Sequence, residues 1–219
     1  MKIQSNFVKR TITGTFFVAI VLLSLITLGG FLAGMGIACI YMIQEYRKML
    51  KDNGTLEQKK SLWYSVFAYF YIIVPLICLV WIFEVEGRIY VLALFAFVWV
   101  NDTFAYLVGS AIGKRKLFER ISPKKTWEGF FGGLIFAVFA GFLFSHFAAD
   151  NNLIKWLGLA VVVVIFGTMG DLFESYIKRN LNVKDSGTIL PGHGGLLDRL
   201  DSILFAAPAA LIYLLLAGW

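Results

Sequence analysis

The sequence predicts an all-α, polytopic membrane protein with about seven transmembrane helices and a cytoplasmic N-terminus. Hydrophobic residues make up 59% of its 219 residues, only 16% are charged, and the mean hydropathy is +0.76. These values lie outside the range of soluble domains. Apolar stretches long enough to cross a bilayer also recur along the chain, separated by polar segments.

The predicted helices are the apolar runs themselves, because a crossing helix needs about 20 mostly apolar residues. They occupy Thr11–Leu28, Phe31–Tyr46, Leu62–Phe83, Ile89–Ile112, Trp127–Phe147, Leu153–Ile177 and Leu200–Gly218. The first two share one uncharged stretch, in which Gly29-Gly30 is the predicted turn because paired glycines interrupt helices. Polar segments separate the later helices: KDNGTLEQKK, EVEGR, GKRKLFERISPKKT, ADNN and KRNLNVKDSGTILPGHGG.

The distribution of basic residues predicts the orientation, since Lys and Arg accumulate on the cytoplasmic side. With seven crossings, 18 of the 20 Lys and Arg residues share one face, and Arg88 and Lys155 lie on the other. The net charge of +6 therefore belongs to a membrane face, where it attracts anionic headgroups and nucleotides. A nucleic-acid partner is not expected. The predicted organisation is an N-terminal hairpin with a basic loop, residues 1–60, followed by a catalytic membrane domain, residues 61–219.

Polar residues that could bind a ligand or take part in a reaction gather in three stretches on the predicted cytoplasmic side. In the first, WVNDTFAYLVGSAIGK, Asn101 and Asp102 interrupt the fourth helix. An acid at that depth must pair, protonate or bind a cation, and a structural hydrogen bond between helices is the alternative. Asp102 shares a helical face with small residues, among them Gly109, which permit a neighbouring helix to approach closely.

The second stretch is ISPKKTWEGFFGG, in which Ser122 and Pro123 predict the start of a helix. Free N–H groups at a helix N-terminus, with Lys124 and Lys125 beside them, would bind an anion. Basic residues at a membrane surface also serve simply as topology determinants, and the sequence leaves both interpretations open.

The third stretch, from Gly170 to Ser202, has the strongest pattern. Asp171, Ser175 and Lys178 fall on one face of the sixth helix, and Asp198 and Asp201 on one face of the seventh. Two facing helices of this kind could hold a hard cation between oxygen ligands, and Mg²⁺ commonly bridges carboxylates to substrate phosphates. Glu174 is the exception, because its spacing to Lys178 suits an ordinary helix ion pair.

Between those helices, the sequence PGHGG offers a backbone that can approach a phosphate closely, and His193 can donate or shuttle a proton. Cations at Lys178, Arg179, Lys184 and Arg199 can offset phosphate charge. The candidate catalytic residues are thus Asp171, Asp198, Asp201, His193, Lys178 and Arg179. The candidate substrate-binding residues are Asn101, Asp102, Ser122, Lys124, Lys125, Thr126, Ser175, Lys184, Asp185, Gly192, Gly194, Gly195 and Arg199.

The motifs S-x-x-K-R, K-D-S-G, P-G-H-G-G and D-R-x-D-S, in this order, resemble the signature of the phosphatidate cytidylyltransferase (CDP-diacylglycerol synthase) family. NDTFAY, SPKKTWEG and GDLFES resemble that family's upstream blocks, so the similarity extends from about Phe97 to the C-terminus. Upstream the chain is shorter than family members, with one helix pair fewer between EYRKMLKDNG and SVFAYFYIIVPL.

This resemblance implies a Mg²⁺-dependent transfer of a cytidylyl group from CTP to phosphatidic acid, giving CDP-diacylglycerol and pyrophosphate. It implies Asp171, Asp198 and Asp201 as the metal ligands and allows a second cation. It also implies a multi-pass protein of a bacterial inner membrane, with its active site on the cytoplasmic side among membrane lipids, and it allows a homodimer.

Two other functions remain open at this stage. A CTP-dependent polyprenol or phytol kinase has a related membrane architecture, although the D-R-x-D-S motif within the full PGHGG block argues against it. An ion-coupled transporter would explain intramembrane acids. A cluster of four cations and a glycine loop on one side of the bilayer fits a translocation path poorly.

The predicted orientation can be tested by accessibility. In a functional cysteine-free background, cysteines introduced at Lys116 and Thr188 should react with an impermeant label from the cytoplasm, and cysteines at Glu86 or Asn151 from outside. Labelling of the Thr188 and Glu86 positions from the same side would contradict the seven-helix arrangement.

Overall fold

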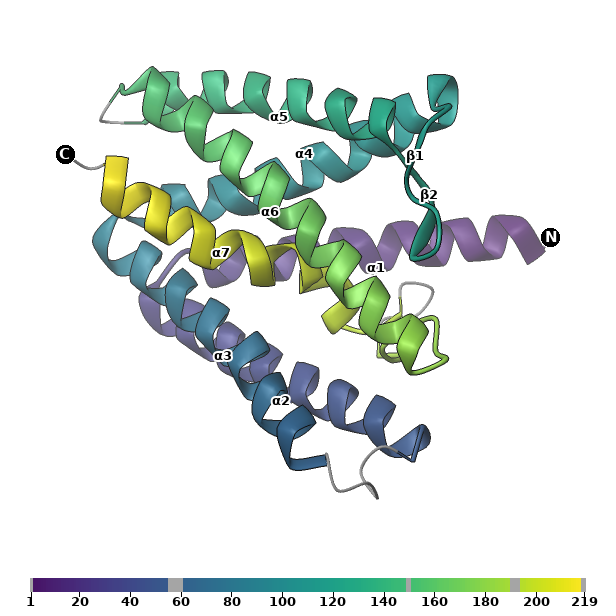
Figure 1. The fold of residues 1–219 in the computed structure, drawn as a ribbon. Coiled ribbons are helices and arrows are strands. Elements are labelled where there is room, and N and C mark those ends of the chain that lie inside the picture. The colour runs from purple at the N-terminus through teal and green to yellow at the C-terminus, as the bar shows by residue number, and fades with distance from the viewer. Residues whose placement is uncertain (1, 55–60, 149–150, 190–193, 218–219) are drawn as a thin grey trace.

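The computed structural model describes residues 2–54, 61–148, 151–189 and 194–217. Within these ranges the chain forms seven α-helices and one two-stranded β-hairpin (Figure 1). The elements in chain order are α1 (Lys2–Ser24), α2 (Leu28–Asp52), α3 (Ser61–Val85), α4 (Arg88–Ile112), β1 (Lys116–Phe118), β2 (Ser122–Thr126), α5 (Trp127–Phe147), α6 (Leu153–Asn180) and α7 (Leu197–Ala217).

The helices confirm the predicted class, an all-α multi-pass membrane protein. Among the described residues, six helices, α2 to α7, are long and apolar enough to cross a membrane. The first helix differs, since its apolar part is limited to Thr11–Ser24 and polar residues precede it. The orientation of the termini stays a prediction.

The helix ends separate into two groups, as the predicted topology requires. In Figure 1 the N-terminus, the β-hairpin and the α6–α7 connection lie toward one end of the bundle, and the C-terminus lies at the other. The two isolated cations at this other end have partners: Lys155 Nζ lies 3.0 Å from Glu86 Oε2, and Arg88 donates a hydrogen bond to the Ile26 carbonyl at 3.3 Å. The charge asymmetry read from the sequence thus corresponds to two ends of one bundle.

The turn between α1 and α2 lies earlier than predicted. α1 ends at Ser24, and the Thr27 side chain caps α2 by accepting a hydrogen bond from Gly30 N at 3.1 Å. Gly29 and Gly30 therefore belong to the first turn of α2, because a threonine cap satisfies the amides that would otherwise be free.

The segment around Ser122 forms a strand, so the predicted helix start at Ser122-Pro123 is wrong. Residues 122–126 pair with β1 in an antiparallel hairpin, and α5 begins at Trp127. Thr126 caps α5 by accepting a hydrogen bond from Gly129 N at 3.2 Å. The Glu128 carboxylate accepts hydrogen bonds from the backbone N–H groups of Lys114 and Arg115 and so attaches the start of the hairpin to α5.

Glycines bring α4 and α5 into close contact, as the small residues of α4 predicted. A Cβ on Gly129 would lie 2.6 Å from the Ala105 carbonyl oxygen, and one on Gly133 would lie 2.4 Å from Asn101 Oδ1. Such distances exclude any side chain. This close approach places the NDTFAY segment directly against the start of α5.

Glu45 links the N-terminal hairpin to the beginning of α7. Its buried carboxylate accepts hydrogen bonds from Leu196 N at 3.0 Å, Leu197 N at 2.9 Å and Ser186 Oγ at 3.3 Å. Amide groups at a helix N-terminus lack intrahelical partners, and the helix dipole favours a negative charge there. The predicted domain boundary at residue 60 remains untested, but this contact crosses it.

Replacement of Glu45 should weaken the attachment of α7. Glu45→Ala leaves two buried amides without an acceptor, and Glu45→Gln presents an amide donor to them. Either change should lower the free energy of unfolding by about 2–4 kcal/mol, measured from thermal unfolding in detergent. Gln44→Ala, one residue earlier and exposed, is the matched control. Equal stability of the Glu45 variants and the control would show that this contact contributes nothing.

Candidate active site

The ends of α6 and α7 are joined by a buried ammonium group. Lys178 forms an ion pair with Glu174 one turn earlier and a second with Asp198 Oδ1 at 2.6 Å. The i,i+4 pair is the one predicted from spacing. The pair across to α7 shows that the predicted polar faces of the two helices do meet. Lys178 is therefore neutralised by protein carboxylates, and it holds the ends of the two helices together.

Asp198 is fully engaged by the protein. Besides Lys178, its carboxylate accepts hydrogen bonds from Ser186 N at 2.9 Å and from Gly195 N at 2.7 Å. A carboxylate surrounded by donors in this way has its lone pairs in use. Asp198 holds Ser186 and Gly195 against the start of α7, and in this arrangement it is poorly placed to bind a cation.

Asp171 faces the β-hairpin. It forms an ion pair with Lys125 of β2, and Ser175 Oγ donates to its Oδ1 at 3.3 Å. These contacts confirm that Asp171 and Ser175 share a face of α6. They also bring SPKKT to the acidic residues, although SPKKT is a strand and not a helix N-terminus.

Asp102 lines two neighbouring cavities. The first, about 290 Å³, includes Asp171, Lys124 and Lys125 in its wall, and the second, about 390 Å³, includes Asp198, Arg199 and Asp201. Residues of α1, among them Thr13 and Phe17, complete the second cavity. Each is near the lower size limit of ligand pockets. Together they surround the acidic residues of three helices.

Besides Asp198, the carboxylates that line these two cavities are Asp102, Asp171 and Asp201. These three lie within electrostatic range of one another. Asn101 Oδ1 is also buried and has no hydrogen-bond partner in the part of the chain that the structure describes. Carboxylate and amide oxygens are ligands that suit Mg²⁺. No three acidic, histidine or cysteine residues of the described ranges lie close enough together to form a ready metal cluster. The ligand set of Asp171, Asp198 and Asp201 stays a prediction.

Gly194 and Gly195, just before α7, lie against carboxylates of the protein. The sequence analysis predicted that the backbone of these glycines would approach a phosphate. Gly194 has a φ of +83°, and a Cβ there would lie 2.5 Å from Asp198 Oδ2. At Gly195 a Cβ would meet the Ser186 hydroxyl and the Glu45 carboxylate. The predicted roles of Gly192 and His193 lie outside the described residues.

The remaining predicted cations and Asp185 lie at the surface of the protein. Lys124, Arg179, Lys184, Asp185 and Arg199 are exposed, whereas Ser122 is partly covered and Thr126 is buried as the α5 cap. The Arg179 guanidinium donates to the Val183 carbonyl at 3.3 Å. Arg199 and Lys124 border the two cavities and are positioned to meet an anionic ligand.

Sequence reasoning missed Glu45 as a part of this site. The signal that could have identified it is an acid at the point where the apolar part of α2 ends, just before Arg47 and Lys48, since an acid at the membrane boundary needs a partner. The identity of that partner could not have been found, because it lies about 150 residues away in the chain.

Known proteins resemble this chain over most of its helical bundle. Residues 53–217 match the model of the cytidylyltransferase family. Proteins named phosphatidate cytidylyltransferase from Staphylococcus aureus and Staphylococcus epidermidis are each 48% identical over 132 residues, which is 59% of this chain and 50% of those proteins. The protein of the same name from Staphylococcus haemolyticus is 50% identical over the same shares.

The chain spans about half the length of these curated relatives. The matched range includes the paired helices α6 and α7, the β-hairpin and the NDTFAY segment, which together surround the two cavities. From the extent of this match, the chain belongs to the cytidylyltransferase family.

Proposed function

We propose that this protein transfers a cytidylyl group from CTP to phosphatidic acid, producing CDP-diacylglycerol and pyrophosphate. The observation that carries the proposal is the meeting of Lys125 and Asp171 beside Asp102, at the point where two cavities adjoin. The names of the curated relatives support the choice of substrates. They do not favour a lipid kinase or a transporter.

The reaction requires no covalent enzyme intermediate. A phosphate oxygen of phosphatidic acid attacks the α-phosphorus of CTP, the new P–O bond forms, and the bond to the β-phosphate oxygen breaks. Pyrophosphate leaves with the electron pair. The protein has to align the two phosphates and stabilise the charge that develops on the leaving group.

Lys124, Lys125 and Arg199 are the side chains that would meet phosphate oxygens. Lys124 and Arg199 are exposed at the two cavities, and Lys125 would exchange part of its contact with Asp171 for a phosphate. Lys178 and Asp198 would keep α6 and α7 in register, because their ion pair joins the two helices.

Mg²⁺ belongs to the proposal as the predicted cofactor. Asp171 and Asp201 are the carboxylates we assign to it, with Asp102 adjacent, because Asp198 is held by Lys178 and backbone amides. When bound, the ion would neutralise triphosphate charge and polarise the phosphorus under attack. A second cation and a homodimer remain predictions.

The proposed location is a bacterial inner membrane, with the cavities opening toward the cytoplasm. The concentration of cations at one end of the bundle supports this orientation. CTP, a cytoplasmic metabolite, would reach the site from that side.

An assay with purified protein tests the reaction directly. Protein in phosphatidylcholine vesicles that contain phosphatidic acid, supplied with CTP and Mg²⁺, should release pyrophosphate and CDP-diacylglycerol in equal amounts. A lipid kinase would instead release CDP and require a lipid alcohol. Absence of a CDP-lipid, with correctly folded protein, would refute the proposed function.

The three aspartates should respond differently to removal of charge. Asp201→Asn should lower kcat/KM by about a hundredfold or more, because a metal ligand is lost, while thermal stability is kept or raised because a buried charge is removed. Asp171→Asn should lower activity similarly. Asp198→Asn should lower the free energy of unfolding by about 2–4 kcal/mol, since Lys178 and two backbone amides lose their acceptor.

Measurement of activity and thermal unfolding on the same preparations separates these effects. A fully stable Asp198→Asn protein with the same activity loss as Asp201→Asn would show that all three aspartates act alike as metal ligands. That result would contradict the structural role assigned to Asp198.

A further inference from the structure

Tyr71 is a buried polar residue to which the proposed reaction gives no role. It lies in α3, a helix that carries a single charged residue, Glu84, near its end. The Tyr71 side chain is 6% exposed, and its hydroxyl is buried without a hydrogen-bond partner among the described residues. A phenylalanine would fill the same space without the cost of an unpaired donor, so the hydroxyl needs an explanation.

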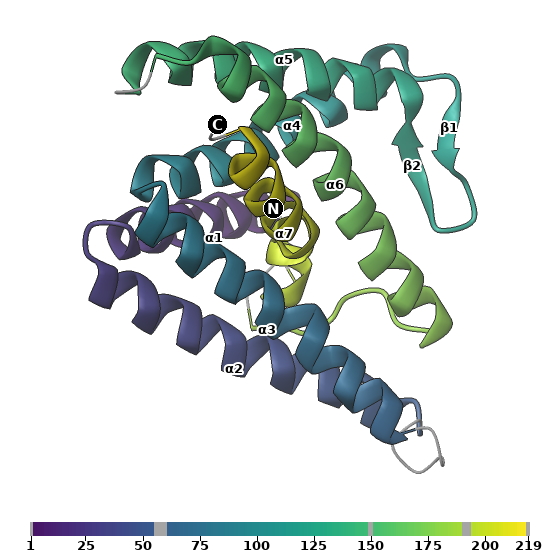
Figure 2. The same ribbon diagram turned by 60° about the vertical axis from the view of Figure 1, so that its left-hand side comes forward.

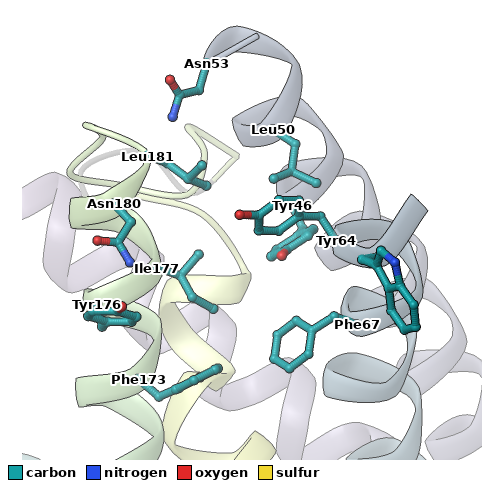
Figure 3. A pocket seen from close by; sticks show the side chains of 11 residues that line it. Tyr46, Leu50, Asn53, Tyr64, Phe67, Phe173, Tyr176, Ile177, Asn180 and Leu181 are labelled. Carbon is teal, nitrogen blue, oxygen red and sulfur yellow. The ribbon is translucent and has the colours of Figure 1, made fainter. Parts of the chain in front are cut away.

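Three phenylalanines fix the position of the Tyr71 ring. Phe67 lies one turn earlier on α3, and the two ring centroids are 6.0 Å apart. Phe173 of α6 and Phe205 of α7 contact the Tyr71 ring edge to face, at centroid distances of 5.6 Å and 6.1 Å. Phe67 and Phe173 also contact each other, with centroids 5.9 Å apart (Figure 3). The phenol ring is therefore packed between three helices, which restricts the position of its hydroxyl.

The hydroxyl of Tyr71 is directed toward the acidic residues of α6 and α7. α7 lies between α3 and α6 (Figure 2), and Phe205 follows Asp201 by one turn on the same face of α7. Among charged residues, Asp201 acts most strongly on the hydroxyl, followed by Glu174 and Asp171. The polar end of Tyr71 thus lies beside the acids that we assign to the cation.

α6 and α7 are in close contact at Asp201. A Cβ on Gly170 would lie 2.5 Å from the Asp201 carbonyl oxygen and 3.0 Å from the Cβ of Phe205. These distances exclude a side chain at Gly170 and fix α7 against α6 at this point. A turn of the Asp201 carboxylate about its terminal torsion, which has a broad energy minimum, is then the smallest motion that brings it to the hydroxyl.

Asp201 is the acid of this group that can best accept the hydrogen bond. Glu174 and Asp171 each form an ion pair with a lysine. Within the described ranges the Asp201 carboxylate forms no ion pair, and its Oδ1 accepts a hydrogen bond from the Ser202 N–H at 2.6 Å. A carboxylate has about four acceptor positions, so Asp201 has capacity for a further donor.

We propose that Tyr71 is a positioning residue for Asp201, and that its hydroxyl donates a hydrogen bond to the Asp201 carboxylate when a divalent cation is bound there. The cation rests on the proposed function, in which Asp171 and Asp201 are its ligands. A hydrogen bond to a ligating carboxylate fixes its orientation and strengthens its hold on the ion. α3 contributes this donor, although it carries none of the proposed ligands.

A purely structural role for Tyr71 is the alternative. The ring makes its contacts with or without the hydroxyl, and a hydroxyl that served the fold alone would be expected to have a partner in the protein. The two roles differ in what loss of the hydroxyl changes. A structural hydroxyl affects the stability of the protein without cation, whereas a positioning hydroxyl affects the affinity for the cation.

Thermal unfolding with and without Mg²⁺ tests the proposal in the absence of turnover. The full chain in detergent is titrated with Mg²⁺ alone, without CTP, and the rise of the unfolding midpoint gives the affinity. Tyr71→Phe should keep or raise the midpoint measured without Mg²⁺, because an unpaired buried hydroxyl is removed. The same variant should bind Mg²⁺ about tenfold to a hundredfold more weakly, since a metal ligand loses its outer partner.

Tyr69→Phe is the matched control, because Tyr69 lies on the same helix with an exposed side chain. It should bind Mg²⁺ like the parent protein, and NaCl at equal ionic strength accounts for general salt effects. An unchanged Mg²⁺ affinity in Tyr71→Phe would overturn the proposal, whatever happens to the midpoint. A parent protein whose midpoint does not respond to Mg²⁺ would overturn it as well.

A double-mutant cycle tests whether Tyr71 acts through Asp201. In the parent protein, Tyr71→Phe should lower kcat/KM about tenfold to a hundredfold at limiting Mg²⁺, and less at saturating Mg²⁺. In the Asp201→Asn background the same substitution should change kcat/KM by less than about twofold, because the carboxylate that it positions is gone. An equal loss in both backgrounds would show that the hydroxyl acts on another group and would overturn the assignment.

The two measurements separate the role of Tyr71 from the proposed function. A protein that makes no CDP-lipid but loses Mg²⁺ affinity in Tyr71→Phe would refute the function and keep the role of Tyr71. A protein that makes CDP-diacylglycerol, with equal Mg²⁺ affinity in the parent and in Tyr71→Phe, would keep the function and refute that role.

Discussion

The buried Lys178 ammonium, shared between Glu174 of its own helix and Asp198 of α7, determines how α6 and α7 meet. A charge taken out of water in a membrane protein is tolerated when its partners surround it closely. Two carboxylates around one ammonium leave a net negative charge, which the backbone N–H groups of Ser186 and Gly195 offset at Asp198. The Lys178–Asp198 pair therefore orders both helices together with Ser186 and Gly195.

The need of buried polar groups for a partner also explains the contact of α2 with α7. The first amides of α7 are directed into the protein, where water cannot satisfy them, and Glu45 supplies the acceptor. Gly194 and Gly195 have no side chains because two carboxylates approach their Cα atoms. Glu45 and Asp198 thus both bind Ser186 and residues at the start of α7, and α2 becomes part of the site.

α6 separates two environments. One face carries Asp171 toward a polar cavity and Lys178 toward Asp198 of α7. The other face carries Phe173 and Ile177 toward a cavity that side chains of α2 and α3 also line (Figure 3). The proposed reaction, between a charged nucleotide and a lipid, needs a polar and an apolar environment within reach of one reacting centre. Residues of one helix can serve both because side chains three or four apart share a face and those between them point away.

The sequence by itself determined the membrane class, the number of helices and most of their ends. These follow from local sums of hydropathy, which do not depend on contacts elsewhere in the chain. The predicted α5, Trp127–Phe147, agrees with the structure at both ends. Two contacts within α6 were also predictable, because residues four apart lie on the same face of a helix. They are the hydrogen bond of Ser175 to Asp171 and the ion pair of Glu174 with Lys178.

Only the tertiary structure decided what each polar residue contacts. Asp198 and Asp201 have the same sequence pattern, yet Asp198 is held by Lys178 and backbone amides whereas Asp201 lies among other carboxylates. The SPKKT segment is a strand because it pairs with residues 116–118, and Glu45 reaches amides about 150 residues away. Such roles arise from hydrogen bonds between distant segments, and no local pattern contains the identity of a distant partner.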